Sequence, residues 1–356
     1  MIELTHGNLL TSRADALVNT VNTVGVMGRG IALQFKQAYP QMFDAYEAAC
    51  KSNKVSLGTM HSFDLGASAG APRWIINFPT KGHWRASSDI RDIEAGLKNL
   101  VDLVRKLRIR SIAVPPLGCG NGGLPWEQVQ ALIEKAFNQL PDVRVLLFAP
   151  GEMPEAATMP NRTPQPEMTT GQAAMILLMD RYLKGLLDPL ISLLELHKLM
   201  YFMQVAGQPL RLRFQADRYG PYASNLRHVL VRLESHYTLG YGDGRDDPSK
   251  PIELIEGAVQ KAEGLLAADL ETRARLDRVG SLIEGYEDAF GLELLSSVHW
   301  VMTSGPACEE SSVVRAIHSW TERKRQLFKP LHIANARKRL VALGWARREP
   351  ECAGDN

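Results

Sequence analysis

Residues 15–33 read DALVNTVNTVGVMGRGIAL, and this stretch decides the fold that we predict for the first half of the chain. The apolar run 16–18 predicts a short strand, and the segment that starts at Ile31 predicts a helix. The glycines between them follow a G-x-x-G-x-G pattern, and glycines let the main chain approach a ligand closely. Because the first amides of a helix favour negative charge, this loop predicts a phosphate-binding turn, with an ordinary tight turn as the alternative.

A second glycine-rich loop follows another short apolar run. Residues 111–114 predict a strand, and residues 115–124 read PPLGCGNGGL before a helix that begins near Trp126. Ligands of parallel α/β sheets collect at the carboxyl ends of the strands, so two such loops can face one another. Two facing glycine loops would suit a diphosphate.

Strands and helices alternate along the first 155 residues. Further strands are expected at residues 2–4, 58–65, 73–78 and 143–148, and helices at residues 31–38, 41–50 and 88–107. Such alternation predicts an α/β fold, specifically a three-layer α/β/α sandwich, for residues 1–155.

The second half of the chain has a different pattern. Residues 156–172 are rich in Pro, Thr, Glu and Met without apolar periodicity, which predicts a linker. Beyond it, long apolar stripes predict a mainly helical second domain over residues 173–356. The expected helices are 173–187, 191–206, 225–239, 255–271, 281–304 and 315–343, the last with a break near Pro330.

Composition narrows the class of protein. The 41 Lys and Arg against 39 Asp and Glu give a net charge of +2, which by itself does not indicate a nucleic-acid binder. The four cysteines (Cys50, Cys119, Cys308 and Cys352) lack C-x-x-C spacing, so we expect reduced thiols, no metal site and no cofactor. No signal-peptide pattern or membrane-spanning apolar run is found, and we expect a cytoplasmic protein.

Three segments resemble the site-forming segments of macrodomains, the modules that bind ADP-ribose. They are residues 18–36 (VNTVNTVGVMGRGIALQFK), 77–85 (NFPTKGHWR) and 115–126 (PPLGCGNGGLPW). Within that family the closest resemblance is to the DarG antitoxins. It implies hydrolysis of ADP-ribose from bases of single-stranded DNA, with thymidine or guanosine as the acceptor and thymidine preferred. The alternatives are a binding module without turnover, and a hydrolase of ADP-ribosyl protein or O-acetyl-ADP-ribose.

Lys81 is the predicted catalytic residue. A loop lysine is by default a solvated surface charge, but an amine beside the ribose can stabilise charge or attack the anomeric carbon. His83 and Arg85 are expected to lower its pKa, and the resemblance implies that hydrolysis depends on it. The binding residues implied by the resemblance are Asn8, Leu9, Asn22, Gly28, Arg29, Gly30, Ile31, Thr80, Gly118, Cys119, Gly120, Asn121 and Phe148.

Several of these positions carry an alternative interpretation. Asn8 stands where many macrodomains have an Asp that reads adenine, and it can instead close an Asx-turn. Phe148 can stack on adenine or be a core residue, and Cys119 is expected to be a small loop residue rather than a nucleophile. Asn22 is expected at the distal ribose and Asn19 is expected to be structural.

A glycine marks a departure from one branch of the family. The human terminal ADP-ribose protein glycohydrolase pairs its lysine with an Asp, and the matching position here is Gly122. This difference argues against a mechanism with a carboxylate base and agrees better with the DarG pattern.

The second half resembles the SocA-like antitoxin domain, also called Panacea. The resemblance rests on residues 194–207 (LELHKLMYFMQVAG) and 212–230 (LRFQADRYGPYASNLRHVL). It implies a domain without chemistry that binds and neutralises a DarT-like ADP-ribosyltransferase toxin. The turn around Gly220 either presents Arg218 and Tyr222 or caps a helix.

Overall fold

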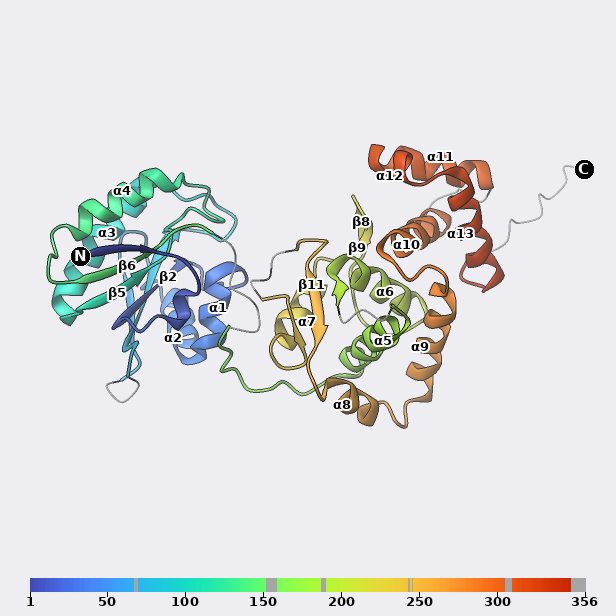
Figure 1. Ribbon diagram of the computed structural model, residues 1–356, viewed down its shortest axis with the longest axis horizontal. Coiled ribbons are helices and arrows are strands. Elements are labelled where there is room, and N and C mark those ends of the chain that lie inside the picture. The colour runs from blue at the N-terminus through green and yellow to red at the C-terminus, as the bar shows by residue number, and fades with distance from the viewer. Residues whose placement is uncertain are drawn as a thin grey trace, which may run out of the picture. The chain divides into compact units, whose positions relative to one another are not determined.

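The computed structural model of the chain describes residues 1–66, 70–151, 159–186, 190–242, 244, 246–304 and 309–346. Internal contacts divide the chain into two units (Figure 1). The first comprises Met1–Pro164 with Gly242–Arg245, and the second comprises Gln165–Tyr241 with Asp246–Asn356. Each unit has hydrophobic clusters of its own. Cys308 and Cys352 lie outside the described residues, so the expectation of reduced thiols applies here to Cys50 and Cys119, which are both free.

The first unit is built on one mixed sheet. Its strands are β1 (Ile2–Thr5), β2 (Ala16–Asn22), β3 (His61–Asp64), β4 (Trp74–Lys81), β5 (Ser111–Val114) and β6 (Arg144–Phe148). Its helices are α1 (Gly30–Ala38), α2 (Pro40–Lys51), α3 (Ile90–Leu107) and α4 (Trp126–Phe137), with a 3-10 turn at Leu9–Thr11. The strand order is β1-β6-β5-β2-β4-β3, and only β3 runs antiparallel to its neighbour.

Helices cover both faces of this sheet (Figure 1). Side chains alternate between the two faces of a strand, so consecutive residues of β2 enter different cores. Val18 packs in the cluster that contains the apolar stripes of α3 and α4, whereas Leu17 packs in the cluster formed with α1 and α2. The predicted three-layer α/β/α sandwich is therefore confirmed.

Helix α3 shows how the sequence fixes one of these layers. The Asp89 side chain accepts a hydrogen bond of 2.9 Å from the Arg91 amide and caps the helix. Ile93, Leu97 and Leu100 then recur on one face and are almost fully buried, each contributing about 1.5–3 kcal/mol. The cap matters for the site, because the segment after β4 ends where α3 begins.

Strands β2 and β4 run further than their apolar cores predicted. β2 extends to Asn22 rather than residue 18, and β4 extends to Lys81 rather than residue 78. A hydrogen bond of 2.9 Å from Asn19 Nδ2 to Asn77 Oδ1 joins two buried polar side chains across the sheet. As a result Asn22 and Lys81 become cross-strand partners at the carboxyl end of the sheet.

The region between the units is partly packed onto the first one. Of the expected linker 156–172, residues 156–158 lie outside the described part of the chain. The Arg162 amide donates to the Gln37 carbonyl at 2.8 Å, and the Arg162 guanidinium carbon lies 5.2 Å from the centroid of the Tyr39 ring. The chain passes to the second unit at Gln165, and the next helix starts at Thr170.

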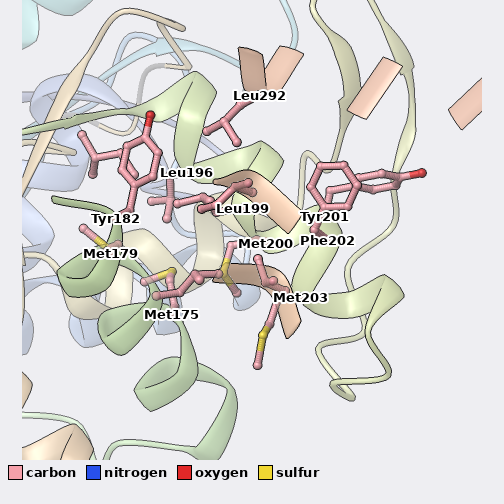
Figure 2. Packing of buried hydrophobic residues seen from close by; sticks show 14 of the residues in the cluster. Met175, Met179, Tyr182, Leu196, Leu199, Met200, Tyr201, Phe202, Met203 and Leu292 are labelled. Carbon is pink, nitrogen blue, oxygen red and sulfur yellow. The ribbon is translucent and has the colours of Figure 1, made fainter. Parts of the chain in front are cut away.

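The second unit is mainly helical, as predicted. Its helices are α5 (Thr170–Leu186), α6 (Leu193–Val205), α7 (Leu226–Leu233), α8 (Ala258–Leu265), α9 (Leu270–Ile283), α10 (Ala289–Ser304), α11 (Glu310–Trp320), α12 (Glu322–Leu327) and α13 (Pro330–Ala342). β7 (Ile191–Ser192), β10 (Thr238–Leu239) and β11 (Pro251–Leu254) form a small sheet, and β8 (Gln215–Asp217) pairs with β9 (Gly220–Tyr222). Figure 2 shows its core, where Met175 and Met179 of α5 meet Leu196, Leu199 and Met200 of α6.

Four expected helices of this unit were too long. The expected helix 281–304 is interrupted between the end of α9 at Ile283 and the start of α10 at Ala289. The stripe 225–239 ends as α7 at Leu233, because the buried Glu234 carboxylate accepts hydrogen bonds of 3.1 Å from the amides of Gly240 and Tyr241. The chain turns there at Ser235, whose φ is 61°. The stripe 255–271 is interrupted between α8 and α9, and residues 315–343 contribute to three helices.

Candidate functional site

The side chain of Asn22 organises the first glycine loop. Its Nδ2 donates to the Val26 carbonyl at 2.6 Å, and its Oδ1 accepts from the amides of Val24 at 3.0 Å and Val26 at 3.3 Å. Tyr46 Oη donates to the Asn22 carbonyl at 2.5 Å. Because the Asn22 amide is only 5% exposed and already bonded on both sides, its contact with the distal ribose stays a prediction.

The first loop ends at the start of helix α1. Gly30 has a φ of +61°, a left-handed value that favours glycine, and α1 begins at this residue. The preceding residues Gly28 and Arg29 are exposed, and Ile31 is half-buried. The first amides of α1 have no partner within the helix, so they can bind an anion.

The second glycine loop lies against this helix start. A Cβ atom built on Gly30 would be 3.7 Å from Nδ2 of Asn121, which is exposed. Gly118 has a φ of +72°, and its carbonyl accepts from the Leu124 amide at 3.1 Å. The structure therefore brings together the two loops that the sequence placed at the same edge of the sheet.

Gly122 cannot carry a side chain in this conformation. A Cβ built there would lie 2.3 Å from Ser88 Oγ and 2.4 Å from the Gly118 carbonyl oxygen. The Ser88 amide donates to the Gly122 carbonyl at 3.0 Å and fixes the loop at this point. The absence of an Asp at residue 122 thus has a steric reason, because any side chain there would overlap with Ser88 and Gly118.

Lys81 reaches the second loop from the end of β4. Its Nζ donates to the main-chain carbonyl of Asn121 at 3.1 Å. Burial lowers the pKa of Lys81 below its usual value, which increases the fraction of free amine. The expectation that His83 and Arg85 lower this pKa was wrong, since burial is the cause and both of these side chains stack on Trp84.

Asn8 and Phe148, the residues expected at adenine, and the neighbouring Leu9 are held by contacts within the protein. Asn8 Oδ1 accepts from the Leu10 amide at 3.0 Å, which is the Asx-turn interpretation. Leu9 is 4% exposed, and Phe148 is 9% exposed in the same hydrophobic cluster. Core packing is therefore observed for Leu9 and Phe148, and their contact with adenine stays a prediction.

Thr80 and Cys119 are held by contacts inside the protein. Thr80 is 4% exposed and its hydroxyl donates to the Val21 carbonyl at 3.4 Å. Cys119 Sγ donates to the Leu117 carbonyl at 3.6 Å, and burial raises the pKa of this thiol to about 11. A thiol that stays protonated at neutral pH is a poor nucleophile, in agreement with the loop-residue interpretation. Gly120 is exposed in the same loop.

Sequence reasoning missed the residues that support the two loops. Tyr46 lies on α2, Ser88 precedes α3, and Thr23 donates from its hydroxyl to the Gly82 carbonyl at 2.7 Å. These contacts join segments that are 24 or more residues apart, so no local pattern marks them. For Tyr46, the available signal in the sequence was a tyrosine on the apolar face of an expected helix.

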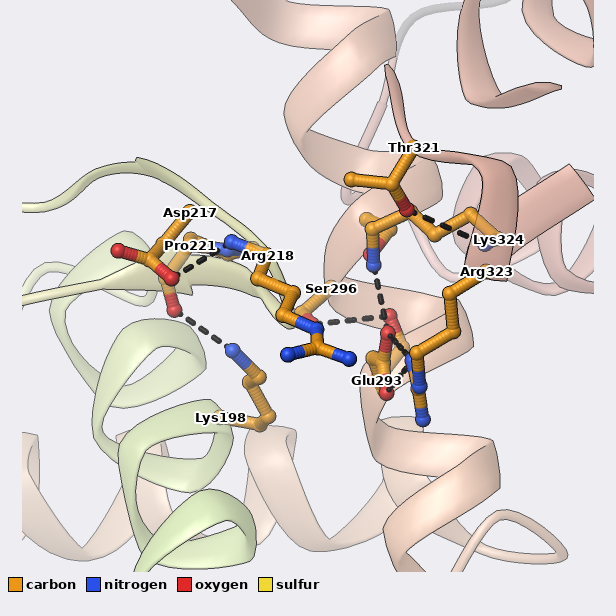
Figure 3. Close-up of polar contacts among 10 residues, drawn as sticks. Lys198, Asp217, Arg218, Pro221, Glu293, Ser296, Thr321, Arg323 and Lys324 are labelled. Atoms are coloured by element: carbon orange, nitrogen blue, oxygen red, sulfur yellow. Dashed lines mark hydrogen bonds and ion pairs between the residues drawn. The ribbon is translucent and has the colours of Figure 1, made fainter. Parts of the chain in front are cut away.

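The second unit contains a buried cluster of charges (Figure 3). The Lys324 ammonium and the Glu293 carboxylate are 2.6 Å apart with side chains 0% and 1% exposed. Arg323 donates to both Glu293 oxygens, at 2.7 and 2.9 Å. Lys198 Nζ donates to the Pro221 carbonyl at 2.8 Å, and burial, with Lys324 nearby, lowers the pKa of Lys198 to about 7.

These charges join separate elements of the second unit. Glu293 on α10 holds Lys324 of α12, and Lys198 on α6 holds β9 at Pro221. Figure 3 shows the Arg218 side chain between these two groups. Arg218, like Asp217 before it, is exposed, whereas Tyr222 is half-buried and stacks on His197 at 4.4 Å between ring centroids.

Two classes of site are not found in the described part of the chain. Among residues 1–66, 70–151 and the other described ranges, no group of three or more His, Cys, Asp or Glu could hold a metal ion. None of the described helices is long and apolar enough to cross a membrane.

Comparison with known proteins agrees with this geometry. The Macro domain family model matches residues 18–133, a range that contains both glycine loops and Lys81. The DNA ADP-ribosyl glycohydrolase of Mycobacterium tuberculosis is 44% identical over 353 residues, covering 96% of this chain and 99% of the relative. The chain belongs to the DNA ADP-ribosyl glycohydrolase family.

One solved structure and one further relative match only part of the chain. The macrodomain of Mycobacterium tuberculosis DarG is 55% identical, covering 42% of this chain and 99% of that one with a TM-score of 0.42. A Thermosipho africanus fusion of DNA ADP-ribosyl transferase and DNA ADP-ribosyl glycohydrolase is 34% identical over 165 residues, covering 42% of each chain. The full-length match to the family includes the second unit, which the macrodomain model does not cover.

Proposed function

We propose that this chain removes ADP-ribose from ADP-ribosylated bases of single-stranded DNA, with thymidine as the preferred acceptor, and that Lys81 is the catalytic residue. The observation that carries the proposal is the Lys81 ammonium, held 3.1 Å from the Asn121 carbonyl where the two glycine loops meet. Removal of ADP-ribose from DNA is the activity for which the family relatives are named, DNA ADP-ribosyl glycohydrolase. In bacterial cells such a substrate lies in the cytoplasm, and we extend that location to this enzyme.

The two loops account for binding of the diphosphate. The start of α1 at Gly30 lies beside Asn121 of the second loop, and we expect main-chain N–H groups of both loops to bind the diphosphate. A helix start carries a partial positive charge, so both features favour the diphosphate of ADP-ribose. The distal ribose would then lie toward Lys81, with Asn22 fixing the loop beside it.

Lys81 acts on the bond between the anomeric carbon and the base. When that bond breaks, positive charge develops on the ribose, the base leaves with the bonding electron pair, and water supplies the new hydroxyl. An amine with a lowered pKa can exist without a proton beside this centre, where it orients the water or attacks the carbon. The Asn121 carbonyl positions the amine for either role.

The variant Lys81→Ala tests this assignment. Release of ADP-ribose from a modified oligonucleotide should fall by at least about 100-fold, while calorimetric binding of ADP-ribose changes little. Lys98→Ala is the matched control, because that lysine lies on α3 with its side chain 75% exposed. Unchanged turnover by Lys81→Ala would refute the role, and binding without turnover by the wild type would identify a reader module.

We also propose that the second unit binds and neutralises a DarT-like ADP-ribosyltransferase. The Thermosipho africanus relative joins the transferase and the glycohydrolase in one chain, which supports a functional partnership. If the second unit neutralises by binding, the Lys81→Ala variant should still inhibit the transferase at stoichiometric concentration. Loss of inhibition in that variant would show that hydrolysis alone protects.

Substrate class can be separated in the same assay. Release from modified single-stranded DNA should exceed release from a modified glutamate peptide or from O-acetyl-ADP-ribose. Gly122 supports this expectation, because the loop has no room for a carboxylate beside Lys81.

A further inference from the structure

An exposed aromatic stack directly follows Lys81. The Trp84 indole is 40% exposed, and His83 and Arg85 on either side of it in sequence are exposed as well. The His83 ring lies 5.3 Å from the indole, centroid to centroid, with 30° between the planes. The Arg85 guanidinium carbon lies 4.5 Å from the indole centroid. Imidazole and guanidinium thus both pack against the indole at the surface, and these three side chains are called the stack below.

Main-chain contacts fix this stack at the rim of the proposed site. Gly82 is bonded through its carbonyl to Thr23 of the first loop at 2.7 Å. The Ala86 amide donates to the His83 carbonyl at 3.0 Å and closes a turn around Trp84. The Ser88 amide then donates to Gly122 of the second loop at 3.0 Å. Both ends of the segment 82–88 are therefore tied to the loops that flank Lys81.

The charge of the segment favours a polyanion. Residues 81–88, which run from the end of β4 to the start of α3, contain Lys81 and Arg85 but no Asp or Glu. One exposed tryptophan alone needs no explanation. An exposed tryptophan that packs against a guanidinium, in a segment with basic but no acidic residues, is a combination with which proteins bind single-stranded nucleic acid.

We infer that the stack of His83, Trp84 and Arg85 binds an unmodified base next to the ADP-ribosylated nucleotide in single-stranded DNA. This inference rests on the proposed function, since it places the modified nucleotide at Lys81. Trp84 is three residues after Lys81, and three residues span at most about 10 Å. One DNA strand can therefore place the modified nucleotide at Lys81 and a neighbouring base at the stack. Bases of a duplex are stacked on each other and are not free to join the protein's aromatic stack, so the site selects single strands.

Two substrates separate this role from a general role in the site. An ADP-ribosylated single-stranded oligonucleotide has neighbouring bases, and the ADP-ribosylated thymidine mononucleoside has none. With the full-length protein, Trp84→Ala should lower kcat/KM on the oligonucleotide roughly 5- to 150-fold and leave it unchanged on the mononucleoside. Trp84→Phe keeps a stacking ring and should retain most of the oligonucleotide activity. An equal loss on both substrates, or no loss on either, would overturn the inference.

Binding of an unmodified oligonucleotide tests the stack without turnover. Fluorescence anisotropy with labelled oligo-dT should show weaker binding to Trp84→Ala than to the wild type or Trp84→Phe. Arg85→Ala should weaken binding more than Arg91→Ala, which removes an 85% exposed arginine paired with Asp89. Equal binding by all variants would refute the site. A wild type that cleaves neither modified substrate would instead refute the proposed function, and the anisotropy result would still decide the role of Trp84.

Discussion

Adding one methyl group at Gly122 should disturb the site through the main chain. The new Cβ in Gly122→Ala would lie 2.4 Å from the Gly118 carbonyl oxygen and 3.0 Å from its carbon. These are backbone atoms, so no side-chain rotation relieves the overlap and the loop has to move. Overpacking of this kind costs about 1–3 kcal/mol. The displaced loop carries the Asn121 carbonyl that positions Lys81, and a shift of about 1 Å there can lower turnover by roughly 100-fold.

Gly120→Ala is the matched control for stability. It lies two residues earlier in the same loop, and a Cβ built there has nothing within 4 Å. Both variants restrict the unfolded chain equally, so their difference isolates the overlap. By calorimetry of the full-length protein, the transition that ADP-ribose shifts upward should melt roughly 3–10 °C lower in Gly122→Ala than in Gly120→Ala. Equal melting temperatures together with wild-type turnover by Gly122→Ala would refute the reasoning.

Two further predictions concern the buried charges of the second unit. Glu293→Gln leaves Lys324 buried without a counter-charge and should lower the free energy of unfolding, measured by urea denaturation, by about 3–5 kcal/mol. Glu3→Gln breaks an exposed pair, in which the Glu3 and Arg144 side chains are 37% and 60% exposed, and should have a much smaller effect. Similar costs for the two variants would contradict the account. The pKa of Lys198 is about 7 in the folded protein against an ordinary value of 10.5, so between those pH values the unfolded state binds more protons and stability rises with pH. The free energy of unfolding of the wild type should therefore rise relative to Lys198→Met by up to about 1.4 kcal/mol per pH unit, and parallel pH profiles would show that the lysine keeps its ordinary pKa.

The sequence predicted the layers of the first unit because its apolar periods are strong. The stripe of α3 and the short apolar cores of β2 and β4 gave the right elements in the right order. Their ends could not be predicted, since the hydrogen bond between the buried Asn19 and Asn77 side chains helps the strands to continue beyond the apolar residues. That continuation is what pairs Asn22 with Lys81.

In the second unit, long-range contacts interrupt patterns that look continuous locally. The apolar stripe over residues 225–239 continues past Leu233, yet the Glu234 carboxylate binds the amides of Gly240 and Tyr241 and turns the chain. Nothing within a helical window indicates which amides a buried carboxylate will bind. The small sheet of β7, β10 and β11 was also missed, because its strands are only two to four residues long and show no clear pattern.

For the site, glycine spacing predicted which loops would meet but not what supports them. The two loops lie together, and Lys81 contacts the second of them. Ser88 lies so close to Gly122, 34 residues away in sequence, that a side chain at residue 122 would overlap with it. This contact explains why the position holds a glycine. The cause of the lowered Lys81 pKa was predicted wrongly. The neighbouring side chains of His83 and Arg85 pack on Trp84, whereas burial of the Lys81 amine lowers its pKa.

The most direct test of the account is a crystal structure of the wild-type protein with ADP-ribose bound. It should show the diphosphate oxygens accepting hydrogen bonds from main-chain amides of residues 28–31 and 118–121. Lys81 Nζ should lie within reach of the anomeric carbon of the distal ribose, directly or through one water. A diphosphate bound away from either loop, or an amine that remains out of reach of that carbon, would contradict the claim that these three segments form one catalytic site.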